Sequence, residues 1–117
     1  MLFRSIVAIT DGTAAAGLPV GSRAKLGDHT IITGERTALL EDGTLAGSVL
    51  TMDGAFRMLI DLGYTMPEAS RMCSTTAAGA LGLDDTGAIA VGTRADLVIL
   101  SRDLRVKQTY VGGRLIS

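Results

Sequence analysis

The 117-residue chain has very few of the residues that build metal and redox sites, with one histidine and one cysteine. A lone cysteine excludes an internal disulfide and fits a reducing cytoplasm. One histidine cannot by itself form a zinc site, and His29 has no cysteine or histidine partner at ligand spacing, so we expect it to bind no metal. Cys73 lies within a helical pattern, where we expect a small buried thiol rather than a nucleophile.

Long apolar runs and blocks of like charge are also missing. No stretch approaches the roughly 18 apolar residues of a membrane-spanning helix. The apolar start of the chain is interrupted by Asp11 too early for a signal peptide. The formal net charge is −1, which argues against nucleic acid and against an anionic membrane surface as partners. These absences predict a cytoplasmic protein.

Aromatic residues make up 3% of the chain and there are two prolines, whereas glycine occurs fifteen times. Hydrophobic residues make up 47%, which is enough for a core, and the length fits one domain or part of a larger one. A composition rich in glycine and aliphatic residues favours α/β packing with tight turns.

Periodicity predicts strands in the first part of the chain. Residues 3–9 are nearly all apolar or β-branched, as in a strand buried on both faces of a parallel sheet. Three short strands are expected within the next segment, separated by glycine-containing turns, at 22–26, 29–33 and 37–40. Residues 41–47 are expected to form a loop.

Two helices and a β tail should follow. Apolar residues at helical spacing predict a helix from 48 or 51 to 62, and Thr65 with Glu68 forms a capping box for a second helix to about residue 81. Strands are expected at 97–100 and 106–111, followed by a Gly-Gly hairpin. Arg94 and Asp96 are either a structural ion pair or solvated, and we favour the ion pair. Four basic residues should lie on the solvent face of the tail strands: Arg102, Arg105, Lys107 and Arg114.

Asp11 directly follows the predicted strand 3–9. A carboxylate at the carboxyl end of a buried parallel strand can act as a general base toward a metal-bound water. Alternatively, an aspartate before glycine is a common turn or cap residue. The segment 42–48 also has two interpretations. Its small residues allow the backbone to approach a ligand closely, or it is an ordinary loop ending in an N-cap serine.

Taken together, these motifs resemble the N-acetylglucosamine-6-phosphate deacetylase family of the amidohydrolase superfamily. The resemblance covers essentially the whole chain but only about the last third of such an enzyme. It is carried by Ile-Thr-Asp at 9–11, Asp-Gly-Thr-Leu-Ala-Gly-Ser at 42–48 with Leu-Thr-Met-Asp at 50–53, and the tail residues Gly87, Ile89, Gly92, 95–98 and 109–113. At Ala77 and Gly79 the chain departs from the family, which usually has a proline and often an arginine in this helix.

The resemblance implies an α/β fold: the C-terminal fragment of a metal-dependent (β/α)8 barrel plus strands of a small β-sandwich domain. Residues 1–83 would end the barrel, and 84–117 would belong to the β domain. Asp11 would be the catalytic base that later protonates the departing amine, while Leu45, Ala46 and Gly47 would contact the sugar-phosphate substrate. The parent enzyme's zinc or iron would be held by a glutamate and two histidines from earlier barrel strands, so this chain is expected to bind no metal alone.

These implications set two expectations, and two alternatives remain. The isolated chain should have no appreciable deacetylase activity, and its unpaired strand edges should produce a homo-oligomer. One alternative is a non-catalytic module that binds a sugar phosphate or complements a separate N-terminal half. The other is the tail of a different amidohydrolase, such as a dihydroorotase-like or cytosine deaminase-like enzyme, although the Leu-Ala-Gly-Ser segment argues against it.

Overall fold

The computed structural model describes residues 5–117, which form two compact units. The strand unit comprises residues 9–55, and the helix unit comprises residues 56–117 with 5–8. Within the described residues, no helix is both long enough and apolar enough to cross a membrane.

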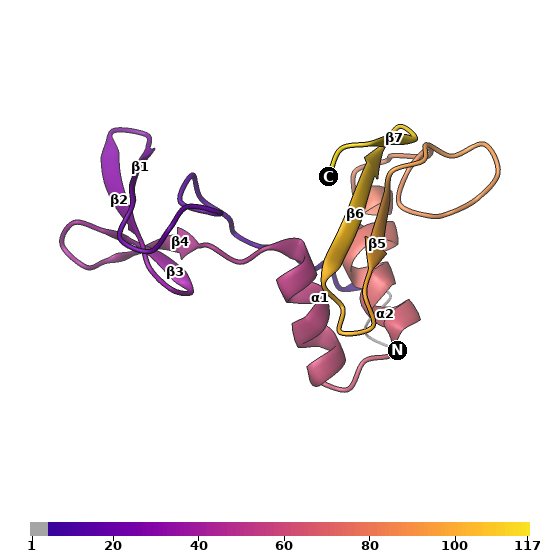
Figure 1. Cartoon of the computed structure of the whole chain (residues 1–117), viewed down its shortest axis with the longest axis horizontal. Helices are drawn as coiled ribbons and strands as arrows, with labels where there is room; N and C mark the ends of the chain where they lie inside the picture. Colours follow the sequence, from indigo (N-terminus) through magenta and orange to yellow (C-terminus); the bar gives the residue numbers. More distant parts are fainter. Residues whose placement is uncertain (1–4) are drawn as a thin grey trace. The chain divides into compact units, whose positions relative to one another are not determined.

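The strand unit contains a four-stranded antiparallel sheet in sequence order (Figure 1). Its strands are β1 Arg23–Leu26, β2 His29–Thr33, β3 Thr37–Leu40 and β4 Leu45–Ser48. The first three confirm the predicted strands. The expected loop over 41–47 is wrong in its second half, because β4 pairs with β3 across a bulge between Ala38 and Leu39. Cross-strand pairing therefore overrides the weak strand propensity of a Leu-Ala-Gly-Ser segment.

A small core lies against this sheet. Ala15, Ile31 and Ala38 are fully buried, and the partly buried hydrophobic residues around them are Ala24, Leu40, Ala46 and Val49. Because two of the three central side chains are alanines, the chain after Asp11 can pack closely on β2 and β3. This packing places residues 11–15 beside the sheet that carries β4.

The predicted strand over 3–9 is wrong for the residues that the structure describes. Residues 3 and 4 lie outside the described part, and residues 6–11 have no strand structure. Ala8 N–H donates to the Met72 carbonyl at 2.9 Å, and Ile9 is 72% exposed. A parallel strand needs a neighbouring strand to form its ladder. In the described chain, the parallel pairing that this segment reaches is a single bridge at Gly12.

Both predicted helices are present. Helix α1 spans Met52–Asp61, and α2 Met66–Ser70 continues through the π-helical turn η2 Arg71–Thr75 into α3 Thr76–Ala80. The capping box is confirmed, since the Thr65 side chain accepts from the Glu68 N–H and the Glu68 carboxylate accepts from the Thr65 N–H. The bond from the Thr65 N–H, followed by one that the Thr65 hydroxyl donates to the same carboxylate at 2.7 Å, lowers the pKa of Glu68. The π turn was not predicted; in it the Thr76 N–H donates to the Arg71 carbonyl.

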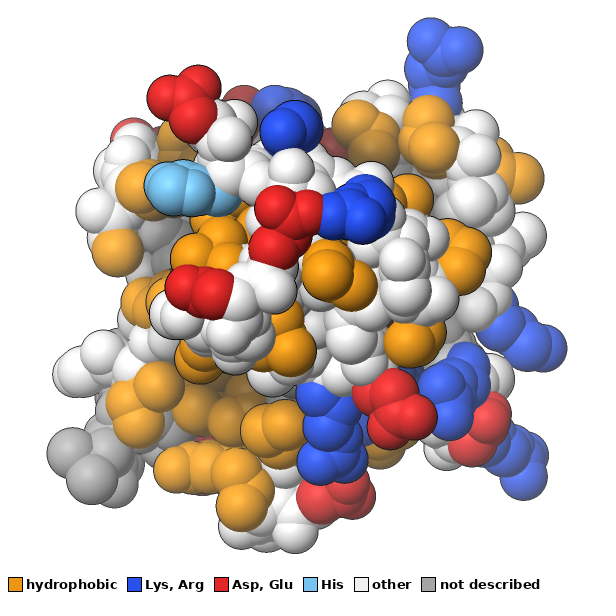
Figure 2. Space-filling model, turned by 90° about the vertical axis from the view of Figure 1, so that its left-hand side faces the viewer, with side chains coloured by type: hydrophobic (Ala, Val, Ile, Leu, Met, Phe, Trp, Pro, Cys, Tyr) orange, Lys and Arg blue, Asp and Glu red, His pale blue; other side chains and the backbone are white. Residues whose placement is uncertain are grey.

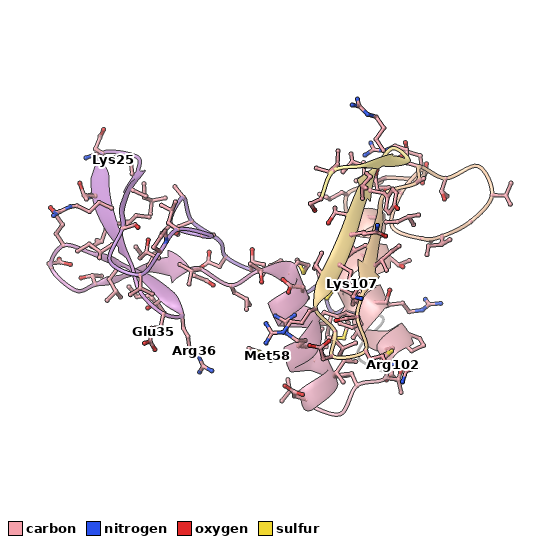
Figure 3. The ribbon with its side chains drawn as sticks, viewed as in Figure 1. Lys25, Glu35, Arg36, Met58, Arg102 and Lys107 are labelled. Carbon is pink, nitrogen blue, oxygen red and sulfur yellow. The ribbon has the colours of Figure 1, made fainter. Side chains whose placement is uncertain are left out.

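The tail forms a three-stranded antiparallel sheet of β5 Leu97–Leu100, β6 Val106–Val111 and β7 Arg114–Leu115, as predicted. Asp96 pairs with Arg94 and accepts the Gly112 N–H at 2.7 Å, which confirms the structural ion pair. The Gly112 bond, followed by Arg94, lowers the pKa of Asp96. The four basic residues predicted to face solvent in the tail are exposed, and Figure 3 labels Arg102 and Lys107 among them.

The segment between α3 and β5 is fixed at Gly87. Its carbonyl accepts from the Ser74 and Thr75 hydroxyls at 3.3 and 2.7 Å. Gly87 has φ +87°, and a Cβ placed there would lie 2.5 Å from the Ala78 Cβ. A side chain at this position would therefore force the segment away from the helix.

We predict that Gly87→Ala destabilises the helix unit more than Gly92→Ala. Gly92 has a similar φ of +89°, but a Cβ at that position would meet nothing within 4 Å, so its substitution isolates the backbone strain. That strain costs about 1 kcal/mol, and the overpacking at Gly87 adds about 1–3 kcal/mol. Urea unfolding followed by helical circular dichroism measures the difference; equal midpoints for the two variants would contradict the close contact.

Candidate functional site

Asp11 has an unusual backbone conformation for a residue other than glycine. Its φ is 50°, in the left-handed region that aspartate tolerates better than most residues. The Asp11 carbonyl accepts the Ser48 N–H at 2.9 Å, and the Ser48 carbonyl accepts the Thr13 N–H at 3.1 Å. These two bonds make the parallel bridge between Gly12 and Ser48. The backbone of Asp11, an exposed residue, is thus held beside the end of β4.

Gly47 lies against this segment with no room for a side chain. It is buried, has φ 147°, and a Cβ there would lie 2.6 Å from Thr13 Cγ2 and 3.6 Å from Asp11 Oδ2. Glycine is therefore required by both conformation and space. The structure thus brings together two of the residues selected from the sequence, Asp11 and Gly47, although they are far apart along the chain.

The other two predicted substrate residues differ in exposure. Leu45 is 65% exposed, whereas Ala46 is partly buried and packs against the small core. The turn before them is fixed by Asp42, whose side chain accepts the Thr44 N–H at 2.9 Å. This bond lowers the pKa of Asp42. The hydrogen-bonded turn is therefore followed by one exposed residue, Leu45, and by two less exposed residues, Ala46 and Gly47.

Cys73 and His29, the single cysteine and histidine of the chain, differ in burial. Cys73 is partly buried rather than fully buried, and burial raises the pKa of its thiol, which makes it a weak nucleophile. His29 is exposed at the start of β2. Among the described residues, no three histidine, cysteine, aspartate or glutamate side chains come together as a metal would need. The described residues therefore do not fit a metal site, and no chemical step through a metal follows from them.

Sequence reasoning missed Thr13 and the pairing role of Ser48. Thr13 Oγ1 donates to the Ser48 carbonyl at 3.4 Å and accepts the Ala15 N–H at 3.2 Å. A helix N-cap was one of the two interpretations of Ser48; it ends β4 instead, and its hydroxyl accepts the Leu50 N–H at 2.7 Å. No local spacing identifies Thr13, because Asp11 and Thr13 lie outside the strands and the contact of Thr13 with Ser48 crosses the fold.

Comparison with known proteins identifies the family to which this chain belongs. Residues 23–116 match the Amidohydrolase family, and the chain belongs to that family. Amidohydrolases generally depend on a metal ion. The mixed strand and helix fold expected from the sequence is confirmed, since it matches part of amidohydrolase structures.

The similar proteins are sugar-phosphate deacetylases by name. N-acetylgalactosamine-6-phosphate deacetylase of Escherichia coli O157:H7 is 40% identical over 116 residues, and N-acetylglucosamine-6-phosphate deacetylase of Lysinibacillus sphaericus is 39% identical over 111. The crystal structure of N-acetylglucosamine-6-phosphate deacetylase from Thermotoga maritima is 40% identical, with a TM-score of 0.84 over 97% of this chain. The resemblance inferred from the sequence is therefore confirmed.

The matches cover different shares of the similar proteins' own lengths. The chain spans 30% of the E. coli O157:H7 protein, 28% of the L. sphaericus protein and 31% of the T. maritima chain. A protein of E. coli K12, provisionally named an N-acetylgalactosamine-6-phosphate deacetylase, is 40% identical, and the match covers 68% of its length.

We predict that Gly47→Ala disrupts the bridge between Asp11 and β4, whereas Gly43→Ala does not. Gly43 also has a positive φ, +86°, but nothing lies within 4 Å of a Cβ there. Both variants incur backbone strain of about 1 kcal/mol, and only Gly47→Ala adds a collision with Thr13. Amide exchange at Ser48 checks this; similar protection of Ser48 in the two variants would contradict the predicted collision.

Proposed function

We propose that this chain supplies the catalytic aspartate and part of the substrate surface of a metal-dependent deacetylase. The reaction is hydrolysis of N-acetylglucosamine 6-phosphate to glucosamine 6-phosphate and acetate. The observation that carries the proposal is the pairing of Asp11 with the end of β4 through the Gly12–Ser48 bridge. Residues 1–83 belong to the end of the catalytic barrel and 84–117 to the β domain in this proposal.

Asp11 carries the proton transfers. Its exposed carboxylate takes a proton from the attacking water and returns it to the nitrogen of the leaving sugar amine, a general base followed by a general acid. Leu45, Ala46 and Gly47 bind the substrate in this proposal, because β4 ends beside Asp11 and Leu45 is 65% exposed. When bound in the assembled enzyme, zinc or iron would supply activation of the attacking water, and its ligands would come from outside the described residues.

N-acetylgalactosamine 6-phosphate is a second candidate substrate. Two relatives that are 40% identical carry that sugar phosphate in their names, and proteins named for the glucosamine compound are 39% and 40% identical. The two sugars differ at one ring carbon and share the acetamido and phosphate groups. The same proton transfers by Asp11 therefore serve either substrate, and comparison of the two in one assay decides between them.

The isolated chain is predicted to be inactive, because it does not bring together the ligands of a metal site within its described residues. Incubated with zinc or iron and N-acetylglucosamine 6-phosphate, it should release no acetate above the blank. Added to the remaining part of the T. maritima enzyme, which is 40% identical to this chain over the shared region, it should restore turnover.

In that restored assembly, Asp11→Asn should reduce turnover by about 10²-fold or more, because the amide cannot accept the proton. Asp28→Asn is the matched control: it removes an exposed carboxylate from the β1–β2 turn, outside the proposed site. A normal rate from the isolated chain, or full activity of Asp11→Asn in the assembly, would refute the proposed role.

We also propose that the isolated chain forms a homo-oligomer through strand edges. Strand β5 pairs with β6 along one edge, and its Val98 and Ile99 are 56% and 45% exposed. Exposed hydrophobic residues are also frequent over the face shown in Figure 2. An apolar edge strand is a template for pairing with another chain.

Light scattering at micromolar concentration should therefore show a species larger than a monomer. Val98→Lys should shift the population toward monomer by placing a charge on the β5 edge. Val91→Lys adds the same charge at a fully exposed loop position outside the sheets and should leave the oligomer intact. A monomeric parent chain is the result that argues against strand pairing.

A further inference from the structure

Thr13 links the buried core of the strand unit to the end of β4. Its hydroxyl accepts the N–H of Ala15, a residue with no exposed surface, at 3.2 Å and donates to the Ser48 carbonyl at 3.4 Å. The Thr13 N–H donates to the same carbonyl at 3.1 Å. One side chain thus joins a core position to the strand that pairs with Asp11.

The Thr13 methyl group limits how closely the Thr13 segment and Gly47 can approach each other. Cγ2 lies where a side chain of Gly47 would begin, at 2.6 Å from the Cβ position. Asp11 Oδ2 lies 3.6 Å from the same position, so Asp11 and Thr13 both approach Gly47. Any movement of Thr13 toward or away from β4 therefore changes the distance between the Asp11 carboxylate and the Gly47 backbone.

The conformation of Asp11 makes such support necessary. A non-glycine residue in the left-handed region is strained and persists only when its surroundings hold it there. Two bonds to Ser48, one on each side of Gly12, supply that restraint. The Thr13 hydroxyl adds a third hydrogen bond, to the Ser48 carbonyl, and its bond from the Ala15 N–H connects the bridge to the core.

We infer that Thr13 is a positioning residue, whose hydroxyl group holds the segment carrying Asp11 at a fixed place beside Gly47. This inference rests on the proposed function for its catalytic consequence. It assigns to Thr13 no contact with the substrate; Thr13 acts through the geometry of Asp11 relative to β4.

Two substitutions separate the parts of this side chain. Thr13→Val keeps the shape and removes the hydroxyl, which leaves the buried Ala15 N–H without the acceptor that Thr13 provides. Thr13→Ser keeps the hydroxyl and removes the methyl group. Thr30→Val is the control, because the Thr30 hydroxyl accepts from the Lys25 ammonium at the surface of the same sheet.

Amide hydrogen exchange of the full chain is the first measurement. Thr13→Val should raise the exchange rate of the Ser48 N–H about tenfold, while Thr13→Ser and Thr30→Val stay near the parent rate. The Thr33 N–H, which donates to the Ser22 carbonyl in the same unit, reports any general loss of stability. Unchanged Ser48 exchange in Thr13→Val, or an equal rise at Ser48 and Thr33, would overturn the inference.

Kinetics of the assembly with the remaining part of the T. maritima enzyme is the second measurement. Thr13→Val should lower kcat about tenfold with KM nearly unchanged, and Thr13→Ser should recover most of kcat. A rise in KM alone would show that Thr13 supports substrate binding instead and would overturn the assignment. If the assembly has no activity, the proposed function fails, while the exchange measurement still decides whether Thr13 holds the bridge.

Discussion

The parallel bridge between Gly12 and Ser48 is the interaction on which the candidate site depends. It consists of two backbone hydrogen bonds, and it joins the segment that begins at Asp11 to the last strand of the antiparallel sheet. Without it, the chain from Asp11 to Thr13 would have no fixed relation to β4. The small core beneath it, with Ala15 at its centre, holds one side of the bridge, and the β3–β4 pairing holds the other.

Local sequence signals predicted most of the elements because those elements are stabilised locally. The Thr65–Glu68 capping box, the hairpins of β1 to β3 and the Gly112–Gly113 turn all depend on contacts between residues close in sequence. Each carries its own signature in residue type and spacing. These predictions succeeded in both position and type.

The failures at 3–9 and at 41–47 have one physical origin, which is dependence on distant partners. The segment before Asp11 has the composition of a buried strand, but composition cannot form a ladder without neighbouring strands. Strand β4 shows the converse, since Leu-Ala-Gly-Ser looks like a loop and becomes a strand by pairing with β3. For the candidate site, Asp11 and Gly47 were identifiable as motifs, whereas Thr13 was not, because its importance arises from contacts across the fold.

The left-handed backbone of Asp11 also restricts which residue can occupy the position, whatever chemistry takes place there. Aspartate, asparagine and glycine adopt this conformation at the least cost, and the longer glutamate does so less readily. Of these four residues, only aspartate combines an acidic group with an easy fit to the backbone. The backbone conformation therefore favours aspartate over glutamate independently of any requirement for proton transfer. Replacement of Asp11 by glutamate is restricted by backbone conformation as well as by side-chain length.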